Sequence, residues 1–150
     1  MLFRSGPKQD PEGAYAAVIP SFIMTLLSHK TPVINGDGSV SRDFTFVDSV
    51  VQANHLAALA EHPEALNTIY NVAHGKRTTL NELVELIRDQ IGEFDSEVRK
   101  IEAKHGPARK GDIAHSLASV EKAERLLGYR PGHTLKEGMA LTVKWFSGNK

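Results

Sequence analysis

Apolar residues recur at helical spacing in the first long segment free of turn formers. From Tyr15 to Leu27 they stand at i, i+3, i+4, i+7, i+8, i+11 and i+12, which predicts an amphipathic helix. Pro20 lies inside this stripe and predicts a kink or a late helix start, because proline has no N–H to donate. Thr31-Pro32 ends the helix.

Four later stretches begin with a residue that can cap a helix and continue with a helical apolar stripe. Two of the beginnings are capping boxes, in which a Thr hydroxyl and a Glu carboxylate each satisfy a backbone amide. The predicted helices run from Asp48 to His62-Pro63, from the Thr79–Glu82 box to Gly92, from Ser119 to Gly128, and from the Thr134–Glu137 box to Phe146.

Short runs between these helices have the composition of strands. Side chains from Val40 to Val47 alternate between two faces of a predicted strand, with Phe44 and Phe46 on one face. Thr68 to Ala73 has the composition of a short apolar strand. Ser96 to Ala103 shows a weak alternation of apolar and polar residues and could be a strand. About five helices alternating with three or four short strands predict an α/β (α+β) fold. The length fits one domain over residues 1–150.

Composition excludes several function classes. Lys plus Arg and Asp plus Glu both number 18, so no global field favours nucleic acid or a membrane surface. The chain has no cysteine, and its seven histidines show no i, i+3 or i, i+4 pair that would indicate a metal site. No apolar run reaches the ~18 residues of a spanning helix, and the N-terminus lacks a signal-peptide pattern. We expect a soluble, cytoplasmic protein.

Two arginines next to turn residues are candidates for anion binding. Arg42 follows the turn Asn35-Gly36-Asp37-Gly38, and Arg109 precedes Gly111-Asp112. Two guanidiniums on one site suit a diphosphate, since each can grip a phosphate in a bidentate way, and a nearby carboxylate can accept from a ribose. The alternative is two unrelated loops with solvated charges, in which Arg42 pairs with Asp43 or Asp48.

Neither glycine turn has the context of a nucleotide loop. Gly36-Asp37-Gly38 precedes a strand instead of joining a strand to a helix, and Gly75-Lys76 lacks the Walker spacing before it.

A series of motifs resembles the C-terminal half of NAD-dependent sugar-nucleotide epimerases and dehydratases, which are extended short-chain dehydrogenases/reductases. The similarity covers nearly all of residues 6 to 147 and is nearest to UDP-N-acetylglucosamine 4-epimerases. The motifs are Gly6 to Pro11, Gly13 to Pro20, Asn35 to Phe44, Val50 to Asn54, Tyr70 to Ala73, Thr78 to Leu83, Arg109 to Asp112 with His115-Ser116, and Leu127 to Pro131.

The resemblance implies a UDP-sugar-binding portion with assigned contacts. Positions matching Arg42 and Arg109 hold the diphosphate, and the position matching Asp112 contacts the uridine ribose. The segment matching Val33, Ile34 and Asn35 lines the uracil, and the position matching Gln9 lies near the sugar end. The position matching Ser116 flanks the hexose, and its small side chain leaves room for an N-acetyl group.

The chain departs from the family where catalysis is concerned. It has no Gly-rich NAD loop, and none of its tyrosines, Tyr15, Tyr70 and Tyr129, has Lys four residues on. Because the hydride chemistry belongs to NAD, we expect no cofactor on this chain alone and no turnover by it, with NAD bound in the intact family.

The expected partners are a UDP-sugar and either an N-terminal NAD-binding half or a second copy of the chain. Two alternatives stay open: a partner-binding or self-associating fragment without catalysis, and the equivalent half of a nucleotide-sugar dehydratase or decarboxylase. A strand such as Thr68 to Ala73 would leave an edge open to a partner.

Overall fold

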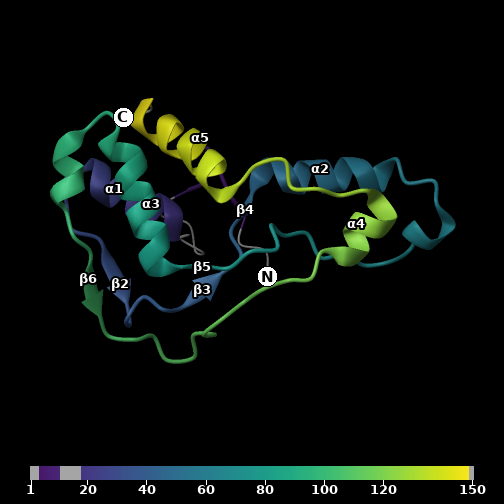
Figure 1. Cartoon of the computed structure of the whole chain (residues 1–150), viewed down its shortest axis with the longest axis horizontal. Coiled ribbons are helices and arrows are strands. Elements are labelled where there is room, and N and C mark those ends of the chain that lie inside the picture. The colour runs from purple at the N-terminus through teal and green to yellow at the C-terminus, as the bar shows by residue number, and fades with distance from the viewer. Residues whose placement is uncertain (1–3, 11–17, 149–150) are drawn as a thin grey trace.

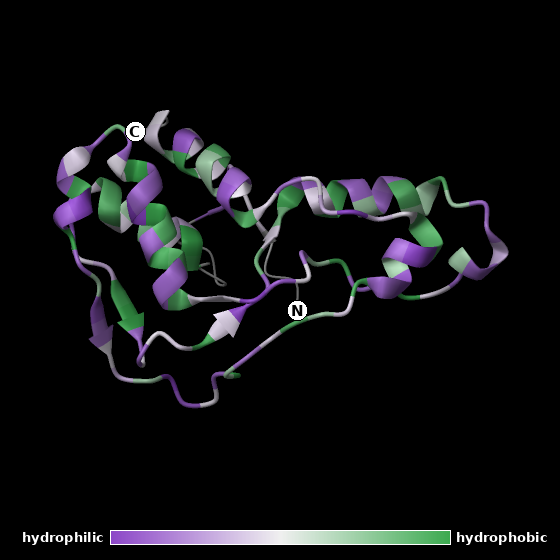
Figure 2. Cartoon of the chain, in the orientation of Figure 1, coloured by the Kyte–Doolittle hydropathy of each residue, from purple (hydrophilic) through white to green (hydrophobic). Residues whose placement is uncertain are grey.

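The three helices with the longest apolar stripes pack against one another and enclose the main core. The computed structural model describes residues 4–10 and 18–148. In it α1 (Val18–Leu27), α3 (Leu80–Gly92) and α5 (Leu135–Gly148) contact each other pairwise (Figure 1). Figure 2 shows apolar and polar positions sharing the surface of each helix, as the amphipathic stripes predict. The main core comprises chiefly Ile19, Ile23, Leu26, Leu83, Ile87, Ile91, Met139, Val143 and Phe146.

A second, smaller core lies at the other end of the molecule (Figure 1). There α2 (Val47–Ala58) contacts α4 (Glu121–Leu127), which also contacts the 3₁₀ helix η1 (Pro63–Ala65). Three of its buried side chains are alanines, which allow these elements to approach closely. The members are Ala53, Ala65, Ala123, Leu127 and Tyr129.

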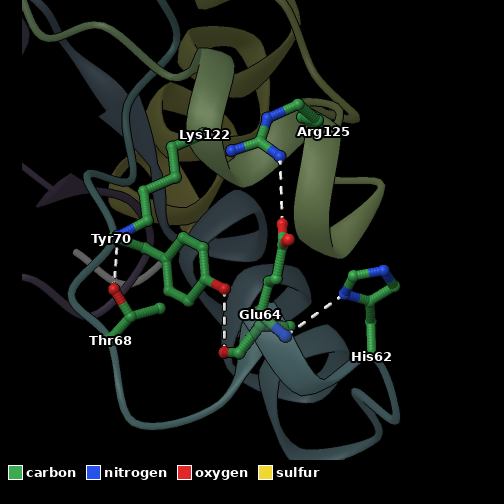
Figure 3. Close-up of polar contacts among 7 residues, drawn as sticks. His62, Glu64, Thr68, Tyr70, Lys122 and Arg125 are labelled. Atoms are coloured by element: carbon green, nitrogen blue, oxygen red, sulfur yellow. Dashed lines mark hydrogen bonds and ion pairs between the residues drawn. The ribbon is translucent and has the colours of Figure 1, made fainter.

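Surface contacts fasten α4 to the chain that follows η1 (Figure 3). Lys122 Nζ donates to Thr68 Oγ1 and lies 5.2 Å from the centroid of the Tyr70 ring. Arg125 Nη1 lies 3.5 Å from Glu64 Oε2. Each contact is exposed and individually weak, but together they hold the segment after η1 along α4.

The described strands are short and form three separate pairs. Two pairs are parallel and one is antiparallel. Pairs of two or three residues are marginal alone, so they depend on the helices and loops around them. The pairs are β1 (Arg4–Ser5) with β4 (Thr45–Phe46), β2 (Val33–Asn35) with β6 (Lys104–Gly106), and antiparallel β3 (Ser41–Arg42) with β5 (Thr78–Thr79).

The predicted strand from Val40 to Val47 is wrong as a single element. It is divided into β3 and β4, and α2 already begins at Val47. Phe44, Thr45 and Phe46 are all buried, with exposed fractions of 4%, 2% and 7%. This stretch is covered on both sides, so the alternation of faces that the sequence suggested does not apply.

Two other predicted strands are also wrong. Thr68 to Ala73 is extended chain outside the described strands, and its Ile69 side chain is 87% exposed. Ser96 to Lys100 forms the 3₁₀ helix η2, because Val98 turns inward and is fully buried on α3, and strand structure begins only at β6.

The observed helix ends match the predicted ones where the capping residues are close to each other in the sequence. Both capping boxes form, with Thr79 at α3 and Thr134 before α5. Gly128 ends α4 at φ +66°, the left-handed conformation expected of a C-terminal glycine. Pro20 is the third described residue of α1. The predicted kink or late start of this helix stays a prediction, because residues 11–17, which include Tyr15, lie outside the described residues.

Two predicted caps are wrong. Phe46 occupies the N-cap of α2 and Asp48 lies within the first turn, because the chain enters the helix directly from the buried β4. Val120 precedes α4, while the Ser119 carbonyl accepts from Asn71 Nδ2 at 3.3 Å. Of the helices in 18–148, none is long and apolar enough to cross a bilayer.

The Thr79–Glu82 box gives α3 a pH-dependent contribution to stability. The backbone N–H and the hydroxyl of Thr79 donate to the Glu82 carboxylate at 2.7 and 2.8 Å, and these bonds lower the pKa of Glu82 below its ordinary 4.5. Because the folded-state pKa is the lower one, the stabilisation is complete above the ordinary value and is lost as pH falls through the folded-state value.

We predict that Thr79→Ala lowers the free energy of unfolding by about 1 kcal/mol at pH 7, measured by urea denaturation, and that Thr79→Ser retains most of it. Glu82→Gln should be less stable than the wild type at pH 7, and the difference should shrink as pH falls below the ordinary pKa of 4.5 and through the lower folded-state pKa. A difference that grows as pH falls would contradict this assignment.

Candidate functional site

Strand β3 is the junction at which three segments of the chain meet. On one edge it pairs with β5, Ser41 opposite Thr79. On the other edge the Ser41 N–H donates to the Ala114 carbonyl at 3.0 Å, and the Ser116 N–H donates to the Ser41 carbonyl at 3.2 Å. Figure 1 shows the chain leaving β6 and passing β3 on its way to α4. The loop that carries Arg109 is thereby attached to the strand that carries Arg42.

Side chains reinforce this second edge. Ser41 Oγ lies 2.9 Å from His115 Nδ1. Arg42 is half-buried, and its Nη1 donates to the carbonyls of Ser41 at 2.8 Å and Ala114 at 3.5 Å. The guanidinium therefore lies over the line where β3 meets the loop.

Asp43 anchors the other end of β3. Its side chain is buried, and its two carboxylate oxygens accept from the backbone N–H groups of His74 at 3.0 Å and Gly75 at 2.9 Å. The Tyr129 hydroxyl donates to the adjacent Ala73 carbonyl at 2.8 Å, and burial raises the pKa of this phenol. The 73–75 turn is thus held from two sides just before it enters β5.

Arg109 lies at the opposite end of the loop, beside β2. The Gly36 N–H donates to the Gly106 carbonyl at 2.9 Å, which continues the β2–β6 pairing by one residue. With the Asn35 amide oxygen turned toward the guanidinium, it accepts from Arg109 Nε at 3.0 Å and Nη2 at 3.3 Å. Asn35 therefore holds two adjacent donors of Arg109.

A turn places Asp112 close to Arg109. The Asp112 N–H donates to the Arg109 carbonyl at 3.3 Å, and the intervening Gly111 has φ +87°. A β-turn with a positive φ at its third residue favours glycine, which explains the Arg-Lys-Gly-Asp order. Arg109 and Asp112 are both exposed.

The structure brings the predicted site residues into two groups, joined by residues 107–113. Arg42 and Ser116 lie at the β3 junction, and Asn35, Arg109 and Asp112 lie at the β2–β6 end. Their convergence on one ligand stays a prediction.

Three predicted contacts are placed apart from these hydrogen bonds. Val33 is 55% exposed on β2, whereas Ile34 is buried in the main core, so any contact of Ile34 with a ligand would be through its backbone. Gln9 is half-buried in the segment after β1.

Sequence reasoning missed side-chain contacts that hold the segments around Arg42 in place. Asp43 was considered only as a partner for Arg42, but its carboxylate faces residues 74–75. An aspartate directly before the buried Phe44-Thr45-Phe46 run was the available signal. The Ser41–His115 contact spans 74 positions and had no local signal.

Two described strands lead directly into a helix, and neither junction has the form of a dinucleotide loop. The two strand-to-helix junctions, β4 to α2 and β5 to α3, have Phe46 and Thr79 at the N-cap and no glycine-rich turn for a pyrophosphate. Residues 4–10 and 18–148 also contain no group of three or more His, Cys, Asp or Glu that could hold a metal ion.

Comparison with known proteins shows the family. A family model described as GDP-mannose 4,6 dehydratase matches residues 2–142. The chain belongs to this family of NAD-dependent epimerases and dehydratases.

Solved relatives in the epimerase/dehydratase family share the fold. The UDP-N-acetylglucosamine 4-epimerase of Methanobrevibacter ruminantium, in complex with UDP-N-acetylmuramic acid, is 40% identical with a TM-score of 0.85. The UDP-glucose 4-epimerase of Thermotoga maritima with UDP-glucose is 36% identical, TM-score 0.84. The Thermus thermophilus UDP-glucose 4-epimerase, in complex with NAD, is 28% identical, TM-score 0.81.

This family member corresponds to only part of its relatives. The three alignments cover 97 to 98% of this chain but 43 to 45% of those structures. The chain also spans less than half the length of the curated relatives it matches, 43% and 42% for two of them. The predicted fold, a portion of an extended short-chain dehydrogenase/reductase with five helices and short strands, is confirmed.

We predict that Asp43→Asn lowers the free energy of unfolding by about 1–3 kcal/mol, measured by urea denaturation. The amide has one acceptor oxygen for the N–H groups of His74 and Gly75, both of which the carboxylate accepts from. The control is Asp48→Asn, the same change at an exposed position of α2, which should stay within about 0.5 kcal/mol of the wild type. Equal effects at both positions would show that the 74–75 contacts are unimportant.

Proposed function

We propose that this chain is the UDP-sugar-binding portion of an NAD-dependent 4-epimerase, with a UDP-N-acetylhexosamine as its substrate. The observation that carries the proposal is the attachment of the Arg109 loop to the Arg42 strand. Both permanent cations thereby lie on segments that are joined by backbone hydrogen bonds, β3 and residues 106–116. Relatives that bind UDP-sugars support the choice of a nucleotide sugar.

A diphosphate suits these two arginines better than a single phosphate does. Nη1 of Arg42 donates to backbone carbonyls, and Asn35 holds Nε and Nη2 of Arg109. Each guanidinium is planar and permanently charged and can bind one phosphate of a diphosphate, and such charge-assisted bonds are strong where the donors are held in place.

The other predicted contacts extend from this diphosphate site in two directions. Asp112 would accept from the ribose, with Val33, Asn35 and the Ile34 backbone beside the uracil. At the other end, Ser116 and Gln9 would border the hexose. Ser116 is half-buried at the β3 junction, and its small side chain leaves space for an N-acetyl group.

Catalysis would need residues that this chain does not supply. We propose that residues 1–150 form a single sugar-nucleotide-binding domain and that an NAD-binding half provides the cofactor site and the acid/base residue. The equivalent half of a dehydratase or decarboxylase would share the diphosphate site, in keeping with the dehydratase description of the matching family model.

A second candidate function is binding of a partner or of another copy of the chain. Large apolar side chains lie exposed on non-helical segments, among them Ile69 at 87%, Ile113 at 68% and Leu117 at 54%. Sedimentation at increasing concentration separates the two functions. A monomer at every concentration argues against self-association and leaves ligand binding untouched.

We predict that the chain binds UDP and that Arg42→Ala and Arg109→Ala each weaken binding about tenfold or more, because each removes a charge-assisted contact to phosphate. Isothermal titration calorimetry measures both. Arg125→Ala is the matched control, since it removes the same charge from an exposed site on α4 and should leave the affinity unchanged. Unchanged affinity in both site variants, or an equal loss in the control, would rule out the diphosphate assignment.

A further inference from the structure

Asn35 makes a contact that the resemblance to epimerases does not assign. That resemblance places Asn35 beside the uracil, whereas its amide, turned so that the oxygen faces Arg109, accepts from two N–H groups of the guanidinium, Nε at 3.0 Å and Nη2 at 3.3 Å. One oxygen between two adjacent donors fixes both the position and the plane of a guanidinium.

The backbone around this contact is itself held firmly. Asn35 pairs with Gly106 in the β2–β6 register, the Gly36 N–H donates to the Gly106 carbonyl at 2.9 Å, and His105 Nδ1 lies 2.9 Å from the Gly36 carbonyl. Arg109 lies only three residues beyond the end of β6, and its side chain is exposed. Without Asn35, the long arginine side chain would have many rotamers to lose on binding an anion.

We infer that Asn35 is a positioning residue that holds Arg109 ready for the diphosphate, and that it does so because it is neutral. The amide occupies Nε and one N–H of Nη2, which leaves the Nη1 side of the guanidinium for phosphate oxygens. A carboxylate at this position would hold Arg109 equally well but would cancel the charge that attracts the anion. This inference rests on the proposed function.

A double-mutant cycle tests the coupling. We expect Asn35→Ala to weaken binding of UDP and of inorganic pyrophosphate by about fivefold to tenfold, roughly the value of one oriented hydrogen bond to a charged group. In an Arg109→Ala background the same change should have no further effect. Asn35→Asp should weaken both ligands at least as much as Asn35→Ala, and the loss should be present for pyrophosphate, which has no uracil for residue 35 to contact.

Three results would overturn the inference: additive losses in the double variant, a loss for UDP but none for pyrophosphate, or full affinity in Asn35→Asp. Thermal unfolding of each variant shows whether it folds. If Asn35→Ala is unstable, Asn35→Asp, which retains the contact with Arg109, replaces it in the binding measurements.

A readout without ligand separates this inference from the proposed function. The Arg109 Nε–H resonance in ¹⁵N-labelled protein should exchange slowly with solvent in the wild type and rapidly in Asn35→Ala. Fast exchange in both proteins overturns the contact itself. A wild type that shows the protected resonance but binds neither UDP nor pyrophosphate overturns the proposed function instead.

Discussion

The hydrogen bonds on both edges of β3 hold the candidate site together. One edge is paired with β5 and the other with residues 114–116, and the buried Asp43 fixes the end of the strand to the 74–75 turn. A two-residue strand would not be stable by itself. Here it is the only described segment that joins the chain around Arg42 directly to the loop that follows Arg109.

The loop from residue 107 to 115 depends on these bonds because it has no buried side chains of its own; every residue in it is exposed. Its two ends are fixed instead, at β6 beside Asn35 and at the β3 junction beside Ser41. An anion that contacts both arginines would connect these two ends a second time. Ligand binding and loop order should therefore be coupled, since each favours the same arrangement.

Sequence patterns predicted the parts of the fold that are determined locally. The capping boxes at Thr79 and Thr134 and the glycine end at Gly128 involve residues within a few positions of each other, and they form as expected. The strands were predicted poorly because their partners are distant. Alternation in Val40 to Val47 could not reveal that both faces are covered, and Thr68 to Ala73 has strand composition but runs along α4 instead.

The same division between local and distant applies to the candidate site. The types of residue suited to phosphate, Arg42 and Arg109, could be read from the sequence together with the glycine turns beside them. The contacts around them could not, because Asp43 accepts from backbone N–H groups 31 and 32 positions away, and Asn35 reaches Arg109 only through the pairing of β2 with β6. The sequence alone does not reveal which residues of these very short strands pair with one another.

The central claim, that β3 and the 106–116 loop present two arginines to one diphosphate, is tested most directly by a crystal structure of the chain grown with UDP. The account predicts that both phosphates lie between Arg42 and Arg109, with nitrogen-to-oxygen distances below about 3.2 Å to each guanidinium. A diphosphate bound elsewhere, or held by one arginine while the other faces a separate surface, would contradict it.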